Sequence, residues 1–317
     1  MKPCIVIGGG GFIGRAVVDF LCGTGRETIV LGRSSRTEHP LPHGCRYVSG
    51  DYGNHTVLRE LLQREADVID LAYSTVPKTS YGDPVFDLLS NLPPSVGLLQ
   101  EAAQAGVGKI VLVSSGGTVY GPARRLPIDE NHPTEPVSPY GITKVTIDRY
   151  AMMFHQNMDL PVCIARPANA YGESQRSGSG QGFLAAAIDS ILSKRHVEIY
   201  GKNGTIRDYV HVSDVARGII AVLELGVPGE AYNIGTGVGT CHADILEILT
   251  DLAQREGLEI KPSFLPERRF DVAANILDSS KLHRVSGWRH QIALRDGLHG
   301  MWNAFVSRRR AEEPSRI

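Results

Sequence analysis

The sequence predicts an α/β protein built on a doubly wound parallel sheet. Short runs rich in β-branched residues alternate with longer amphipathic stretches through the first half of the chain, which is the pattern of βαβ units. A glycine-rich turn follows the first run and opens the first amphipathic stretch. With 317 residues, 42% of them hydrophobic, the chain is long enough for about two domains. We therefore expect the sheet domain to be joined by a smaller α/β domain.

The elements of the sheet domain follow this alternation. In the first expected helix Ile13, Val17 and Leu21 recur at helical spacing, and Gly23 and Gly25 supply its end. The expected strands are 4–8, 28–31, 46–49, 67–71, 109–114 and 162–166. The expected helices are 12–22, 55–64, 84–105 and 138–157.

The pattern changes after residue 172. A Gly- and Ser-rich loop at 172–182 precedes a helix near 183–194 and a short strand at 197–200. The segments 210–225 and 231–237 look like strands, so we expect the chain to return to the first sheet. Helices near 242–256 and 292–308 close the chain. The expected domains are 1–172 plus about 206–237, and about 173–205 plus 238–317.

Charge and cysteine content exclude several classes of function. The net charge of −1 provides no basic field for nucleic acid or anionic lipid, and the run Arg308 to Arg310 is expected to be a solvated tail. The five cysteines are an odd number without a Cys-x-x-Cys pair, and no histidines cluster at metal spacing. No stretch reaches roughly 18 apolar residues. We expect a cytoplasmic protein with reduced thiols, without a metal site, that binds neither membrane nor nucleic acid.

The turn at residues 8–14 has the context of a dinucleotide-binding fingerprint, because a strand precedes it and a helix follows. Its glycines let the backbone approach a pyrophosphate, and the N–H groups at the helix start meet its charge. A tight turn without a ligand is disfavoured by five glycines in seven residues. Both G-x-G-x-x-G and G-x-x-G-x-x-G fit the spacing. We expect a Rossmann-type domain whose cofactor contacts Gly8, Gly11, Phe12, Ile13 and Gly14.

The end of the second strand bears on the choice between NAD and NADP. A dinucleotide site usually carries an acidic residue there, which accepts from the ribose 2′-hydroxyl. Here the strand ends Leu31-Gly32-Arg33, without a carboxylate. A guanidinium in that place suits a 2′-phosphate, so NADP is favoured; in the alternative, Arg33 stacks on adenine or faces water. Asp51, followed by Tyr52, is placed to accept from the adenine amine.

Tyr140 and Lys144 lie four residues apart, one turn along the same helix face. A phenol with a pKa near ~10 is a poor base at neutral pH, but an adjacent cation stabilises its phenolate. The pair is then able to exchange a proton with a substrate hydroxyl while a nicotinamide exchanges a hydride. In a chain with 11 tyrosines the pair alone is a weak signal.

The surrounding motifs strengthen the interpretation of Tyr140 and Lys144 as a catalytic pair. The pair lies in Ser138-Pro-Tyr-Gly-Ile-Thr-Lys, and upstream a strand ends Ser114-Ser-Gly-Gly-Thr-Val-Tyr-Gly. With the glycine turn, these motifs resemble the extended short-chain dehydrogenase/reductase family, in its NAD-dependent nucleotide-sugar epimerase/dehydratase branch, from Lys2 to about Asn303. The resemblance implies that Tyr140 is the catalytic acid/base and that Lys144 lowers its pKa and binds the nicotinamide ribose. Further cofactor contacts implied by matching positions are Leu71, Ala72, Asn91 and Pro167.

The resemblance also implies a homodimer, in which the helices near 84–105 and 138–157 form a four-helix bundle. One position departs from the family pattern, because the catalytic Ser or Thr falls on Gly116. Ser115 or Thr118 would then carry the proton, or Tyr140 would contact the sugar directly. In 4,6-dehydratases of the branch an acidic pair stands at the positions of Gly117 and Thr118, so 4,6-dehydration is not expected here.

The second half resembles the nucleotide-sugar side of the same family. Asn169 matches a residue that bonds the substrate near its diphosphate, and Arg207 and Arg268 match phosphate-binding arginines. Two guanidiniums on one diphosphate make chemical sense, although paired surface arginines are the alternative. Asp271 matches a residue that binds ribose hydroxyls. The full expected substrate set is Asn169, Gln181, Tyr200, Arg207, Arg268 and Asp271.

These features predict 4-epimerisation of a UDP-sugar with tightly bound NAD or NADP. Tyr140 would take the C4 hydroxyl proton as hydride moves to the nicotinamide, and hydride would return to the other face of the rotated 4-keto sugar. An NADPH-dependent reductase of a nucleotide 4-keto sugar is the alternative, favoured by Arg33 and by Gly116. A non-catalytic dinucleotide sensor is a third, disfavoured by the presence of both Tyr140 and Lys144.

Overall fold

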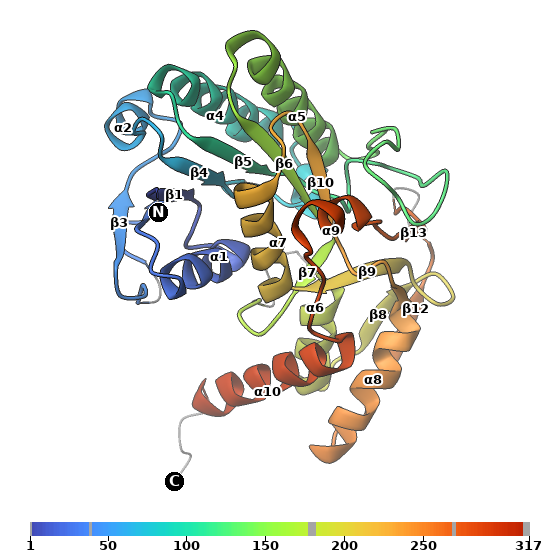
Figure 1. Cartoon of the computed structure of the whole chain (residues 1–317). Helices are drawn as coiled ribbons and strands as arrows, with labels where there is room; N and C mark the ends of the chain where they lie inside the picture. The colour runs from blue at the N-terminus through green and yellow to red at the C-terminus, as the bar shows by residue number, and fades with distance from the viewer. Residues whose placement is uncertain (1, 38–39, 177–181, 268–270, 313–317) are drawn as a thin grey trace.

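The computed structural model describes residues 2–37, 40–176, 182–267 and 271–312. Its main sheet has seven strands, all parallel, in the order β10-β6-β5-β4-β1-β2-β3 (Figure 1). Their bounds are β1 Cys4–Ile7, β2 Thr28–Gly32, β3 Cys45–Ser49, β4 Asp67–Asp70, β5 Lys109–Val113, β6 Val162–Pro167 and β10 Ala231–Ile234. The strand order reverses next to β1, which confirms the doubly wound Rossmann-type sheet. A ligand crevice is expected at the carboxyl ends of the strands at this reversal.

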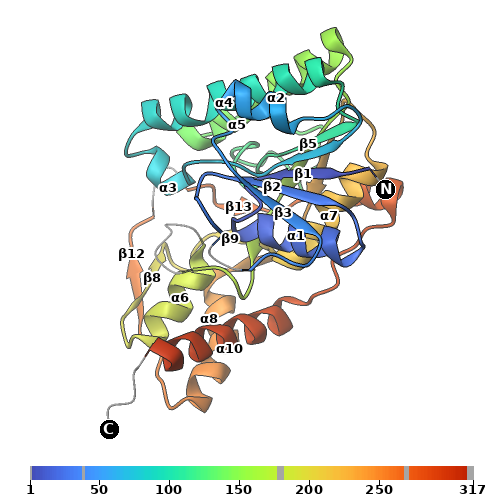
Figure 2. The ribbon, with the colours of Figure 1, turned by 90° about the vertical axis from the view of Figure 1, so that its left-hand side faces the viewer.

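Helices cover both faces of the main sheet (Figure 2). One face carries α2 His55–Leu61, α4 Pro84–Ala105 and α5 Pro139–Met158, and the other carries α1 Phe12–Gly23 and α7 Val212–Leu225. The alternation of side chains along β1 shows why. Ile5 and Ile7 belong to the core beneath α4 and α5, whereas Cys4 and Val6 belong to the core beneath α1 and α7.

A smaller part of the molecule has its own hydrophobic core, which includes Ile188, Leu249 and Trp302. It lies below the main sheet in Figure 1. Its elements are α6 Phe183–Leu192, β8 Val197–Tyr200, α8 His242–Arg255, β12 Pro262–Leu265 and α10 Leu294–Glu312. A small sheet of β7 Asn169–Tyr171, β9 Ile206–His211, β11 Gly239–Cys241 and β13 Ala274–Asn275 accompanies it. The short helices α3 Pro77–Ser80 and α9 Ser280–Ser286 complete the described elements. The exact domain boundaries that we expected stay a prediction.

Two sequence expectations were wrong. The segment 210–225 is not a strand, because the chain leaves β9 at His211 and forms α7, whose Val215 and Ile219 pack against the sheet core at helical spacing. The arginines 308–310 are not a solvated tail. They continue α10, where Arg308 donates to Glu173 O at 2.7 Å and its guanidinium lies over the Phe305 ring. A long side chain of this kind packs its stem while its charge finds carbonyl acceptors.

No helix within the described ranges has the length and apolar character needed to cross a membrane. The same residues bring together no group of three or more His, Cys, Asp or Glu suited to a metal ion.

Candidate active site

The glycine turn between β1 and α1 leaves no room for a side chain at Gly8, Gly9 or Gly14. Gly8 has a φ of +78°, and a Cβ there would lie 2.9 Å from Ala72 N; a Cβ on Gly14 would overlap Gly8 O. Gly11 is the N-cap of α1, whose first turn has neither a capping side chain nor an acidic residue. Phe12 continues from it into that turn. The N–H groups at this helix start are suited to an anion, so the turn fits the pyrophosphate of a dinucleotide.

The end of β2 lies beside this turn, because Gly8 N donates to Leu31 O at 2.9 Å. A Cβ on Gly32 would lie 2.6 Å from Tyr47 Oη, so a side chain at that position would require the Tyr47 ring to move. Arg33 is exposed. Asp51 is also exposed and accepts from Gly53 N at 3.0 Å. The structure thus leaves both charged groups accessible on the carboxyl-end edge of the sheet.

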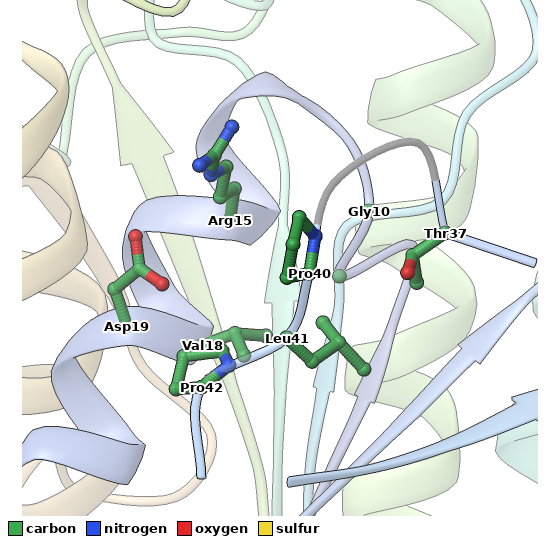
Figure 3. Close-up of a pocket in the computed structure, with 9 residues that line it drawn as sticks. Gly10, Arg15, Val18, Asp19, Thr37, Pro40, Leu41 and Pro42 are labelled. Atoms are coloured by element: carbon green, nitrogen blue, oxygen red, sulfur yellow. The ribbon is translucent and has the colours of Figure 1, made fainter.

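A small cavity adjoins the glycine turn on its α1 side (Figure 3). Gly10, Arg15 and Asp19 line it opposite Thr37 and Pro40, from the segment that follows β2. Its volume of about 20 Å³ is room for about one water molecule, so the cavity is not the dinucleotide site.

Asn91 positions the loop that follows β4. Its side chain is fully buried, with Oδ1 accepting from Ser74 N at 2.7 Å and Nδ2 donating to Asp87 O at 2.7 Å. These bonds fix the course of the loop that begins Leu71-Ala72. A direct contact between Asn91 and the cofactor stays a prediction.

Helix α5 carries the Tyr-x-x-x-Lys pair on one buried face. Ser138 caps the helix by accepting from Gly141 N at 3.1 Å, and Pro139 occupies its first position. Tyr140 is 9% exposed and Lys144 is 7% exposed. Lys144 Nζ donates to the carbonyl of Val113, the last residue of β5, at 2.9 Å. The pair therefore lies at the carboxyl end of the strands, on the same sheet edge as the glycine turn.

Ser115 is the hydroxyl residue that acts on Tyr140, because the interaction of its side chain with the phenol lowers the pKa of Tyr140. A Cβ on Gly116 would lie 2.8 Å from Arg166 O and would overlap Leu277, so the family's hydroxyl has no room at that position. Thr118 Oγ1 is buried without a hydrogen-bond partner among the described residues. A Cβ on Gly117 would lie 3.3 Å from Asn169 Oδ1 and 3.9 Å from Ser115 Oγ. Asn169 therefore belongs to the same group of polar atoms.

Pro167 joins this group through its backbone. Its carbonyl accepts from Gly116 N at 2.9 Å, which ties the end of β6 to the loop that carries Ser115. Gly116 O in turn accepts from Asn275 Nδ2 of β13 at 3.0 Å. The loop that carries Ser115 is thus held from both parts of the molecule.

Three buried carboxylates surround Lys144. They come from Asp70 at the end of β4, Asp87 in α4 and Asp148 in α5. Burial lowers the pKa of Lys144 to about 8, and these three charges act in the opposite direction. Asp148 is also paired with Arg166 at 3.0 Å, so its charge is shared between Arg166 and Lys144. Burial raises the pKa of Asp70 to about 6, and Lys144 opposes that rise.

The electrostatics of Tyr140 differ from the expectation. Burial, followed by the charge of Asp87, raises the pKa of Tyr140, whereas its hydrogen bond with Ser115 lowers it. Lys144 Nζ lies 5.9 Å from the centre of the Tyr140 ring. In this structure the phenol therefore holds its proton.

In the smaller part of the molecule, Arg207 is half-buried and donates to its neighbour Ile206 O at 2.8 Å. Burial lowers the pKa of Arg207, and Tyr209 and Asp271 oppose this effect. Burial and the nearby charge of Asp271 raise the pKa of Tyr81, which follows α3 in the larger part. The charge of Asp271 therefore acts on a residue of the smaller part, Arg207, and on a residue of the larger part, Tyr81.

Tyr200 ends β8, and its hydroxyl donates to Glu198 Oε2 at 2.9 Å. An open cavity of about 550 Å³ adjoins this end of the strand, with Gly201, Phe264 and Glu267 among its lining residues. Two expected substrate residues, Gln181 and Arg268, lie outside the described residues.

Sequence reasoning missed Asp70, Asp87 and Tyr73. Asp70 interrupts the apolar run of β4 at its carboxyl end, which was an available signal for a site residue. Asp87 stands four residues before Asn91 on the same helix and accepts from Thr143 Oγ1 at 2.7 Å. Its role depends on a contact between α4 and α5 that no local pattern predicts.

Known proteins share this fold and this arrangement of motifs. Residues 4–235 match the model of the NAD dependent epimerase/dehydratase family. The chain belongs to this family. The chain is similar to the UDP-glucose 4-epimerase of Mycolicibacterium smegmatis, with 34% identity over 304 residues that cover 93% of this chain and 95% of that protein.

Two solved structures extend the likeness of this epimerase/dehydratase to the fold. The UDP-glucose 4-epimerase of Thermotoga maritima with UDP-glucose gives a TM-score of 0.90 at 30% identity, covering 97% of this chain and 99% of that one. The UDP-glucose 4-epimerase of Thermus thermophilus in complex with NAD gives a TM-score of 0.88 at 28% identity, covering 96% of this chain and 99% of that one.

Proposed function

We propose that this epimerase/dehydratase is a 4-epimerase of a UDP-hexose or UDP-N-acetylhexosamine. The observation that carries the proposal is the buried pair Tyr140 and Lys144, on the sheet edge that also presents the glycine turn, with Ser115 acting on the phenol. A phenol beside an ammonium and a serine hydroxyl supplies a proton path to a sugar alcohol, and the turn fits a dinucleotide. The UDP-glucose 4-epimerases to which the chain is similar support the choice of substrate class.

In the proposed mechanism Ser115 bonds the C4 hydroxyl and relays its proton to Tyr140 as the C4–H bond breaks. The nicotinamide, when bound, supplies the acceptor and later the donor of the hydride. Lys144 stabilises the phenolate that the outward step needs. Because burial favours the protonated phenol, uptake of the C4 hydroxyl proton by the phenolate is the step that burial assists, and return of the proton depends on Lys144 to stabilise the phenolate that it leaves. Arg207 and Asp271 hold the nucleotide while the 4-keto sugar presents its other face.

The proposed cofactor is NAD or NADP, retained through the cycle because epimerisation has no net redox change. The family description and the NAD complex of the Thermus enzyme support NAD. Arg33 is exposed and Gly32 carries no carboxylate, and this combination favours binding of the 2′-phosphate of NADP. Denaturing the purified protein and identifying the released dinucleotide by mass spectrometry tests this choice.

A second candidate is an NADPH-dependent reductase of a nucleotide 4-keto sugar. Gly116, which cannot accept a side chain, and Arg33 favour it. We do not propose a 4,6-dehydratase, because neither Gly117 nor Thr118 is acidic, whereas the resemblance implies an acidic pair at these positions in the family's 4,6-dehydratases.

The deciding experiment incubates the purified protein with UDP-glucose, UDP-galactose and their N-acetyl analogues, and separates the products by chromatography. We expect interconversion of a 4-epimer pair without added cofactor. Oxidation of one of these C4 alcohols to its 4-keto sugar, with stoichiometric reduction of added NADP⁺, is the reverse of the reductase reaction and would instead identify the reductase. Absence of both reactions with all four nucleotide sugars would reject the proposed substrate class.

We also propose a homodimer through α4 and α5. These helices expose a set of large apolar side chains that includes Phe86 at 54%, Leu89 at 59% and Ile142 at 53%. Burying such a face stabilises an interface. Light scattering after size exclusion is expected to give twice the chain mass for the wild type and a monomer for Leu89→Glu. The matched substitution Phe264→Glu, which is exposed on β12, should leave the dimer intact. A monomeric wild type would reject this assembly.

A further inference from the structure

Tyr73 lies in the loop directly after β4 and joins the two members of the catalytic pair. Its ring centre is 4.8 Å from that of Tyr140, with 64° between the ring planes. Lys144 Nζ lies 4.0 Å from the centre of the Tyr73 ring, compared with 5.9 Å from the Tyr140 ring. Of these two rings, the Tyr73 ring is therefore the one that makes the cation–π contact with the Lys144 ammonium.

The hydroxyl of Tyr73 has a less defined role than its ring. Its oxygen is buried and makes no well-oriented hydrogen bond with the described residues. The groups that act on this phenol, Asp87, Tyr140 and Thr143, belong to α4 and α5. The contacts that tie Tyr73 to the catalytic pair are thus made by the ring.

The charge on Lys144 needs this support. The lysine is buried, and its ammonium contacts the carbonyl of Val113 and the Tyr73 ring. A cation over an aromatic face is favoured over a neutral amine in the same place, and the preference grows when water is excluded. The other ionisable groups that act on the Lys144 ammonium are Asp70 of β4, Asp87 of α4 and Asp148 of α5.

We propose that Tyr73 is a positioning residue whose ring holds the Lys144 ammonium charged and in place beside Tyr140. The inference deepens the proposed function and rests on it for the meaning of the activity. Nothing in this role requires the phenol oxygen. Phenylalanine at position 73 should therefore preserve the support of the Lys144 ammonium, whereas an aliphatic side chain of similar bulk should lose it.

The direct test measures the titration of Lys144 by NMR in the dinucleotide-loaded protein labelled with ¹³C at the lysine Cε. The chain has eight lysines, and Lys144→Arg assigns the signal by its loss. We expect Tyr73→Phe to titrate as the wild type does, and Tyr73→Leu to lower the pKa of Lys144 by about half a pH unit or more. Equal titration in Tyr73→Leu and the wild type, or an equal fall in both variants, would overturn the proposal.

The second readout is the pH profile of turnover. Tyr73→Phe should retain kcat within about threefold, while Tyr73→Leu should lose about 10-fold or more, with its alkaline limb moved to lower pH and KM unchanged. Phe20→Leu, an exposed aromatic of α1, is the matched control and should change neither quantity. If Tyr73→Leu does not fold, Tyr73→Met serves in its place.

The two readouts fail separately. A wild type that turns over no nucleotide sugar rejects the proposed function, while the NMR titration still tests the contact between Tyr73 and Lys144. A loss of kcat in Tyr73→Phe equal to that in Tyr73→Leu would assign the role to the hydroxyl and overturn the ring proposal.

Discussion

The proposed catalytic group and the proposed nucleotide-binding group of this epimerase/dehydratase differ in how the chain surrounds their polar atoms. Lys144 is buried and donates to Val113 O, and Tyr140 is buried, with Ser115 lowering the pKa of its phenol. Arg207 is half-buried and donates to the adjacent carbonyl, while Tyr209 Oη is buried without a partner among the described residues. The chain itself surrounds the proposed catalytic groups, whereas the proposed nucleotide-binding groups keep polar atoms that a ligand would complete. Substitutions in the two groups should therefore change different kinetic constants.

The largest expected effect tests the first group. Tyr140→Phe removes the proton carrier and keeps the ring that packs on Tyr73, so kcat should fall about 10²- to 10⁴-fold with KM nearly unchanged. Steady-state kinetics measures both constants. Tyr150→Phe, an exposed tyrosine on the same helix, is the control. An unchanged kcat in Tyr140→Phe would leave Thr118 or a water as the proton carrier and end the proposed mechanism.

The next effect tests the second group. Arg207→Met removes a cation that bonds the diphosphate, so KM should rise about 10- to 100-fold while kcat changes little. Arg195→Met, in the same part of the molecule and paired with Asp189 at the surface, should leave KM unchanged. A selective loss of kcat in Arg207→Met would place this arginine with the catalytic group and remove the contrast between the two groups.

A smaller effect concerns the missing hydroxyl. Gly116→Ser places a Cβ 2.8 Å from Arg166 O and against Leu277, so it should destabilise the fold by about 1–3 kcal/mol without raising activity. Urea unfolding measures the stability. Gly23→Ser is the control, because no atom lies within 4 Å of a Cβ at that position. A stable and more active Gly116→Ser would show that the loop adapts to the family's usual residue.

The smallest effect is a pH dependence with opposite signs for activity and stability. Burial lowers the pKa of Lys144 to about 8 from its ordinary value of 10.5, so between these values the unfolded chain binds more protons. The contribution of Lys144 to stability should therefore rise with pH from about 8 to 10.5, while activity falls as the ammonium is lost. Unfolding of the wild type and of Lys144→Met at about pH 7.5 and about pH 9.5, on either side of the lowered pKa, measures the difference. A stability gap between the two proteins that does not change with pH would contradict the assignment.

The local patterns predicted much of the fold because they reflect local physics. The glycine turn requires backbone freedom and a following helix, and both are present at Gly8 to Gly14. The sequence predicted a helix at 84–105, and α4 has these bounds. The local signals at its ends are Asp83, which caps its start, and Gly106, which follows its last residue with a φ of +66°. The same reasoning failed at α7, where the β-branched residues Val212 and Val215 imitate a strand and burial against the sheet decides for a helix.

The sequence by itself determined that Tyr140 and Lys144 share a helix face and that a glycine turn of the dinucleotide-binding type opens the chain. It also determined that a glycine, Gly116, stands where the family pattern has a Ser or Thr. Tertiary structure alone decided that Ser115 acts on Tyr140, that the charges of Asp70 and Asp87 join that of Asp148 in acting on the Lys144 ammonium, and that the Tyr73 ring lies beneath the ammonium. These groups come from β4, α4, β5 and α5, which are distant in the chain. Their charges and contacts depend on distance in space and on the exclusion of water, and neither quantity is written in the spacing of residues along a sequence.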